Sequence, residues 1–130
     1  MMQKDGSVYR TLRMSTREKE EIRNLVKSLA SEGRIGIDEH VYRDNRAYDR
    51  WGINPFQLFD FLKRILINPE IKRKEVHNTN YFPTRYLCES ELNDFTYPCI
   101  TGINESDQGF VIVTTLLNRR ENAKVNRGKT

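Results

Sequence analysis

The sequence lacks the short motifs that identify a chemistry on their own. It contains no phosphate-binding Gly-x4-Gly-Lys loop, no Gly-x-Gly-x-x-Gly turn, no His-Glu-x-x-His zinc helix and no serine nucleophile elbow. Cysteine is scarce, since only Cys88 and Cys99 occur and no Cys-x-x-Cys pair surrounds them. We therefore expect reduced thiols in predicted strands, with a disulfide or a metal site as the alternatives. We expect no metal and no cofactor.

Long apolar runs are also missing. No stretch approaches the roughly twenty apolar residues that a membrane helix needs, and the N-terminus carries no apolar leader segment. We expect no membrane partner, and either a cytoplasmic protein or the released tip of a larger one. Internal repeats and linker-like segments are absent too, which predicts a single domain over residues 1–130 with flexible ends at 1–7 and 121–130.

Charge and aromatic residues are abundant. Charged residues make up 31% of the 130 residues, and six Phe, six Tyr and one Trp argue against disorder. The formal net charge is +4, and arginine outnumbers lysine, which suits bidentate contacts to phosphate. This balance favours an acidic partner, most commonly nucleic acid.

Local patterns predict a short strand and two helices in the first half. Val8–Met14 alternates apolar and polar residues and predicts a strand. A Ser15–Glu18 capping box opens a helix over Thr16–Glu32, which Gly33 ends. Asn54 followed by Pro55 begins a second helix, which Asn68-Pro69 ends. The segment between the helices is predicted as a loop or an irregular short helix.

The second half predicts antiparallel strands. The expected strands are Ile71–His77, Thr84–Glu89, Cys99–Ile103 and Phe110–Leu117, with turns at Ser90–Asp94 and around Asn104, Asp107 and Gly109. The predicted fold class is therefore α+β: a short N-terminal strand, two helices, then a three- to four-stranded antiparallel sheet with the helices on one face.

The polar run Asp38–Arg50 is the first candidate for chemistry. His40 lies among arginines, with Tyr42 and Tyr48 between them. Metal-free RNA cleavage needs a base, an acid and cations around the phosphate, and aromatic rings stack on unpaired bases. The arginines concerned are Arg43, Arg46 and Arg50. Asp38, Glu39, Asp44 and Asp49 offer a plainer explanation, in which the arginines form weak surface ion pairs.

Three further groups of residues are candidates for phosphate or base contacts. The first is the basic strand Lys72, Arg73, Lys74 with His77, an alternative general base; the second is Tyr81 with Arg85; the third is Thr115 with Arg119 and Arg120. Each has a structural explanation as well: protection of an edge strand, a surface cross-strand pair, and β-prone threonine followed by a basic tail.

Two features of the sequence belong together: the stretch Glu39-His40…Arg43…Arg50-Trp51-Gly52-Ile53, which leads into a helix, and the hairpin Ile100–Ile103 with Phe110–Thr115. Both resemble the small RelE/MqsR-like ribonuclease toxins, a group that includes colicin-type and contact-dependent toxin tips. In those toxins the pattern is His…Arg…Arg-Gly-Ile/Leu, so Trp51 before the glycine is a departure. The resemblance implies metal-independent cleavage of mRNA or tRNA and a cognate antitoxin or immunity protein as partner.

Carried over by position, the resemblance implies that His40 is the acid or base, with Arg43 and Arg50 as its cationic partners and Thr115 as the hydroxyl of the last strand. With the candidates above, this gives a catalytic set of His40, Arg43, Arg46, Arg85 and Thr115. The alternative is a binding module, phage-encoded or regulatory, that contacts nucleic acid or a host protein. An enzyme should hold His40 or His77 in a concave pocket with at least two arginines. A binding module should present a flat or convex basic face with the histidines apart.

Overall fold

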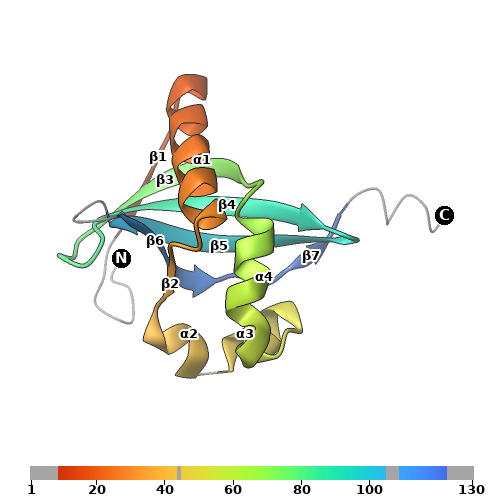
Figure 1. The fold of residues 1–130 in the computed structure, drawn as a ribbon. Helices are drawn as coiled ribbons and strands as arrows, with labels where there is room; N and C mark the ends of the chain where they lie inside the picture. Colours follow the sequence, from red (N-terminus) through yellow and green to blue (C-terminus); the bar gives the residue numbers. More distant parts are fainter. Residues whose placement is uncertain (1–8, 44, 105–108, 123–130) are drawn as a thin grey trace.

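A single twisted β-sheet organises the chain (Figure 1). The computed structural model describes residues 9–43, 45–104 and 109–122. The strands are β1 Tyr9–Leu12, β2 Ile35–Ile37, β3 Glu70–His77, β4 Thr84–Leu92, β5 Phe95–Asn104, β6 Phe110–Leu116 and β7 Arg120–Glu121. Within these described residues the sheet has seven strands, in the order β1-β3-β4-β5-β6-β2 with β7 paired to β5. Only the β2–β6 pair is parallel among the pairs of described strands.

The described helices lie between β1 and β3 in the chain. They are α1 Thr16–Ser31, α2 Glu39–Arg43, α3 Arg46–Trp51 and α4 Leu58–Ile65, with a 3-10 turn η1 Pro55–Gln57 before α4. Both predicted N-caps are confirmed: Ser15 accepts from the Glu18 amide at 3.1 Å, and Asn54 accepts from the Phe56 amide at 2.9 Å. Gly33 adopts φ +75° after α1, a conformation that glycine reaches without strain.

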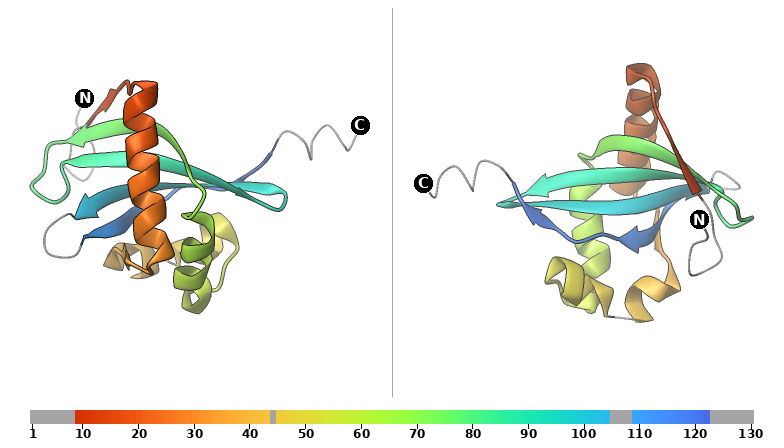
Figure 2. Two further views of the ribbon diagram at one scale, coloured as in Figure 1. Left: turned by 45° about the horizontal axis from the view of Figure 1, so that its top comes forward. Right: turned by 180° about the vertical axis from the view of Figure 1, so that it is seen from behind.

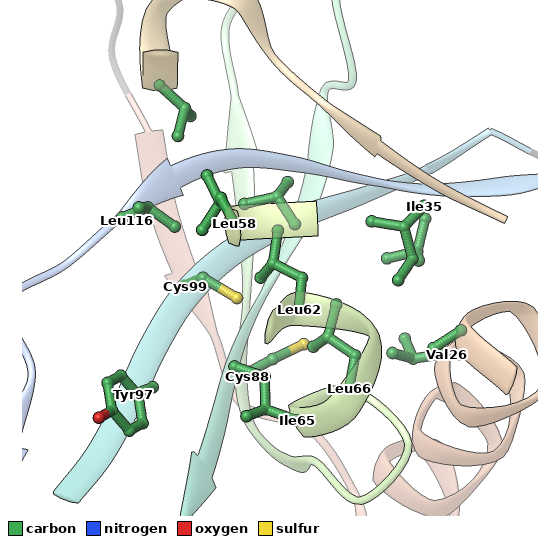
Figure 3. Close-up of a cluster of buried hydrophobic side chains, with 14 of the residues drawn as sticks. Val26, Ile35, Leu58, Leu62, Ile65, Leu66, Cys88, Tyr97, Cys99 and Leu116 are labelled. Carbon is green, nitrogen blue, oxygen red and sulfur yellow. The ribbon is translucent and has the colours of Figure 1, made fainter. Parts of the chain in front are cut away.

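The core lies between the sheet and the two longer helices. α1 and α4 cross the same face of the sheet (Figures 1 and 2). Figure 3 shows Leu62 and Leu66 close to the thiols of Cys88 and Cys99. All four of these side chains are fully buried. Both cysteines are free thiols on paired positions of β4 and β5, which agrees with the expected reduced core thiols.

The predicted α+β class is confirmed, but the sheet and helix counts were too small. β2 escaped prediction because three residues carry too little pattern to identify a strand. β4 continues to Leu92, through most of the turn predicted at Ser90–Asp94. The polar segment after β2 forms α2 and α3.

The chain ends were predicted to be flexible. Most of residues 1–7 and 121–130, and the turn residue Asp107, lie outside the described residues. Within the described part, Arg120–Glu121 forms β7, and the Asn122 amide donates to the Asp94 carbonyl at 3.1 Å. The beginning of the expected tail is therefore paired with the sheet.

Candidate functional site on the open face of the sheet

The face of the sheet opposite α1 and α4 is crossed by none of the described helices (Figure 2, right). We call it the open face. Because side chains alternate along a strand, residues that neighbour core positions point to it. The strand registers assign to this face the partners Tyr9 and His77, Glu75 and Arg85, and Ile100 and Thr115. Aromatic, charged and hydroxyl side chains therefore share one surface.

Asp38 and His40 form a pair beside this face. Asp38 follows β2, and its amide donates to the Val113 carbonyl at 2.9 Å, which extends the pairing of β2 with β6. Its Oδ1 accepts from the His40 amide at 3.2 Å and lies 2.7 Å from His40 Nδ1. Because a carboxylate only accepts, Nδ1 is assigned the proton, and Nε2 remains as the basic nitrogen. The His40 side chain is 39% exposed and that of Asp38 is 17% exposed, so the histidine is the accessible partner.

Tyr81 is the third member of this group. Its hydroxyl lies close enough to the Asp38 carboxylate for each group to shift the pKa of the other. Burial raises the pKa of Asp38, but the His40 amide, the Tyr81 hydroxyl and the His40 ring together hold that pKa below its ordinary value. Burial and the interaction with Asp38 raise the pKa of Tyr81. The site thus combines an ionised carboxylate, an oriented imidazole and a protonated phenol.

The loop between β3 and β4 brings Tyr81 to Asp38. Arg85 donates from Nε to the Phe82 carbonyl at 2.9 Å and from Nη2 to the Tyr81 carbonyl at 3.0 Å. Phe82 has φ +50°, and its ring lies so close to Gly102 that a Cβ there would be 2.5 Å from Phe82 Cδ1. Arg85, predicted to clamp a phosphate, therefore holds the loop that carries Tyr81.

The arginines predicted around His40 divide between two environments. Arg43 forms an exposed pair with Glu39 at 2.9 Å within α2. Arg50 donates to the Leu116 carbonyl, and burial, assisted by the nearby charge of Arg46, lowers its pKa. Arg50 therefore joins α3 to the end of β6. Arg43 is exposed on the same short helix as His40, and Arg46 is half-buried at the start of α3.

Thr115 lies on the open face of β6, opposite Ile100. The register between β5 and β6 shifts at this point, and the neighbouring Thr114 is the extra residue of a β-bulge. The Thr114 hydroxyl donates to the Ile100 carbonyl at 3.1 Å. β2, which pairs with β6, leads into Asp38. The Asp38 amide donates to the carbonyl of Val113, which lies two residues before Thr115. Thr115 is thus a half-buried hydroxyl on the strand beside the Asp38–His40 pair.

The basic strand β3 splits between the two faces. Lys74 pairs with Glu18 of α1 at 2.7 Å on the covered face, and Lys72 pairs with Glu70 at 3.2 Å. Arg73 and His77 both contact Glu75 on the open face. Between β3 and the strand that leads into Asp38 lie β4, β5 and β6. The two histidines are therefore not brought together, and one scissile phosphate would not meet both.

Arg119 and Arg120 serve the fold at the end of the sheet. Arg119 Nη1 donates to the Trp51 carbonyl at 2.9 Å, and its Cζ lies 3.9 Å from the centroid of the Phe95 ring. Arg120 pairs with Glu89 at 2.6 Å. Both were predicted to contact nucleic acid, and each already has an intramolecular partner.

Sequence reasoning found His40 but gave Asp38 a different role. Asp38 was grouped with the acidic residues that would neutralise arginines, although its Asp-x-His spacing to His40 was a usable local signal. Tyr9 and Glu75 were not selected at all. Only the pairing of β1 with β3 brings Tyr9 beside His77, whereas Glu75 precedes His77 by two residues on β3, a spacing that the sequence did offer. In the described part of the chain, no three His, Cys, Asp or Glu side chains are grouped so as to hold a metal ion.

Comparison with known proteins adds no assignment. The chain matches no protein-family model, no curated protein and no solved structure. Among the helices that the structure describes, none has the length and apolar character needed to cross a membrane.

Proposed function

We propose that this protein is an endoribonuclease toxin that cleaves mRNA or tRNA without a metal ion, with His40 as its general base. The observation that carries the proposal is the Asp38–His40–Tyr81 group beside an uncovered sheet face. A carboxylate that holds Nδ1 of a histidine leaves Nε2 to accept a proton and stabilises the imidazolium that results. The net charge of +4 supports RNA as the substrate and an acidic antitoxin or immunity protein as the partner.

The proposed reaction is an internal phosphoryl transfer. Nε2 of His40 takes the proton of a ribose 2′-hydroxyl, and the 2′-oxygen attacks the adjacent phosphorus. The bond from phosphorus to the 5′-oxygen breaks, and that oxygen takes a proton, for which we assign the Tyr81 hydroxyl as donor. The products are a 2′,3′-cyclic phosphate and a free 5′-hydroxyl.

Cations near His40 would stabilise the charge that develops on the phosphate oxygens. Arg43 and Arg46 are the residues that we assign to this role, and the Thr115 hydroxyl would orient a phosphate oxygen. Arg43 is available because its exposed pair with Glu39 contributes little and is easily exchanged for a phosphate. Arg85 would act indirectly, since its guanidinium holds the backbone that carries Tyr81.

A non-enzymatic RNA-binding module is the second candidate, and one observation favours it. The two histidines lie on separate parts of the sheet, and neither lines any of three clefts that described residues form along α1, η1 and α4. This arrangement meets one criterion expected of a binding face. It predicts affinity for RNA without cleavage.

Cleavage of RNA by the purified protein separates the two candidates. We expect fragments that end in 2′,3′-cyclic phosphate, and a rate that falls about 100- to 10,000-fold in His40→Ala. Asp38→Asn should also slow cleavage, whereas Asp60→Asn, at an exposed aspartate of α4, is the matched control and should not. Expression in a bacterial host should arrest growth for the wild type and not for His40→Ala. RNA that stays intact with the purified wild type would refute the enzymatic proposal.

A further inference from the structure

A second group of side chains occupies the open face at the opposite edge of the sheet. Arg73, Glu75 and His77 alternate along β3, so all three point to this face. Arg73 donates from Nε and Nη2 to Glu75 Oε2 at 3.1 and 2.8 Å, and His77 Nε2 lies 2.9 Å from Glu75 Oε1. Both carboxylate oxygens are therefore engaged. The Glu75 side chain is only 4% exposed, although its position on β3, opposite Arg85, places it on the open face.

This network fixes the ring of His77, and Tyr9 stacks upon it. The two rings are nearly parallel, at 14°, with centroids 4.9 Å apart. The His77 side chain is 10% exposed, whereas Tyr9 is 42% exposed. Tyr9 is therefore the outer ring of the stack. Arg73, with a 37% exposed side chain, supplies a positive charge on the same face.

A strand edge does not need this arrangement for stability alone. Burying a carboxylate is unfavourable unless it is fully paired, and β-branched residues pair strands without that penalty. The network instead produces a rigid aromatic platform beside a cation. Sequence-tolerant recognition of single-stranded nucleic acid uses these two elements, a ring for a base to stack on and a positive charge for the backbone.

We propose that the Tyr9–His77 stack is a subsite that binds a nucleobase of single-stranded RNA, with Arg73 near the adjoining phosphate. The inference rests on the proposed function, because it takes RNA as the ligand of the open face. β3 is separated from the strand leading to Asp38 by three intervening strands, so the base at Tyr9 belongs to a nucleotide remote from the cleaved bond. Tyr9 and His77 therefore govern affinity for the substrate strand, and His40 governs the chemistry.

Affinity for a 2′-O-methyl RNA oligonucleotide tests the subsite, because such RNA is not cleaved. Fluorescence anisotropy of the labelled oligonucleotide gives the dissociation constant. Loss of one stacked base should weaken binding about 5- to 150-fold in Tyr9→Ala, while Tyr9→Phe keeps the ring and the affinity. Tyr9→Leu retains an apolar side chain without an aromatic face and should bind as weakly as Tyr9→Ala, which covers the case in which the alanine variant does not fold. Phe56→Ala removes an exposed ring from η1 and serves as the control.

The outcomes for the subsite and for the enzyme are separable. Equal affinity of wild type, Tyr9→Ala and Tyr9→Leu would overturn the subsite, even if the wild type cleaves RNA. Tyr9-dependent binding by a protein that does not cleave would support the subsite and refute the enzyme. A wild type that does not bind the oligonucleotide would also overturn the subsite. An oligonucleotide of abasic nucleotides should bind weakly, and with the same affinity to wild type and Tyr9→Ala. If Tyr9→Ala weakened its binding, Tyr9 would be contacting something other than a base, and the subsite would be overturned.

Discussion

Replacing Gly102 with alanine tests whether the sheet holds the Tyr81 loop in place. A Cβ at this position would lie 2.5 Å from Phe82 Cδ1, 2.6 Å from Cγ and 2.9 Å from Cβ. These separations are shorter than carbon atoms tolerate. The Phe82 ring has little freedom to move away, since Arg85 binds the carbonyls of Tyr81 and Phe82. The new methyl group must therefore lift the loop.

The expected loss of stability is that of an overpacked site, about 1–3 kcal/mol. Urea unfolding measures it, and Trp51, the single tryptophan, is fully buried and reports the transition by fluorescence. With a denaturant slope of about 1–3 kcal/mol per molar urea, a loss of about 2 kcal/mol lowers the midpoint by about 1 M. Lifting the loop also removes the Tyr81 hydroxyl from Asp38, so RNA cleavage should fall with stability.

Two further variants isolate the cause. Gly33→Ala has open space around the new methyl group but strains a positive φ, so it should cost about 1 kcal/mol without disturbing Tyr81. Phe82→Ala removes the two closest clashing atoms, Cδ1 and Cγ, and leaves only its Cβ at 2.9 Å, so adding Gly102→Ala to it should cost less than in the wild type. If the two effects instead add within about 0.5 kcal/mol, Phe82 and Gly102 are not coupled and the reasoning is refuted.

Two other predictions concern titration. The folded state lowers the pKa of Asp38, so its carboxylate stabilises the protein at pH values above its unfolded pKa near 3.8, and this stability is lost as the pH falls through the lower folded pKa. The difference in urea midpoint between wild type and Asp38→Asn should therefore be largest above about pH 5 and shrink toward pH 3. A difference independent of pH would contradict this. Burial raises the pKa of Cys88 to about 11 and that of Cys99 well above its ordinary value, so a water-soluble thiol reagent at pH 8 should label neither until the protein unfolds, and rapid labelling of the native protein would disprove their burial.

The elements that sequence reasoning placed correctly are those whose signals are local. The capping box at Ser15 and the glycine at Gly33 bound α1 because hydrogen bonds within four residues decide where a helix begins and ends. The closing hairpin was predictable from alternation and β-propensity. β2 was not, since Ile35–Ile37 is a strand only because β6 lies beside it as a parallel partner. A three-residue strand is a tertiary contact, and sequence patterns do not contain it.

The candidate site divides in the same way. His40 stood out by residue type, and its oriented state depends on Asp38 two positions earlier, a local relation that sequence reasoning had available. Tyr81 reaches the same carboxylate from a loop on the far side of β4, β5 and β6. No spacing in the chain encodes that approach. The stack of Tyr9 on His77 likewise joins residues from opposite halves of the protein.

Arginine is the residue type whose role was hardest to predict, because a guanidinium serves a phosphate and a backbone carbonyl equally well. Arg50 and Arg119 donate to carbonyls at the junction of β6 and α3, so recruiting either to a phosphate would open that junction. Among the described residues, the partner of Arg43 is Glu39, in an exposed pair that can be exchanged. In the proposed reaction, the cation most able to follow the charge that develops on the phosphate is therefore Arg43. Arg50 and Arg119 instead stabilise the fold through their bonds to backbone carbonyls.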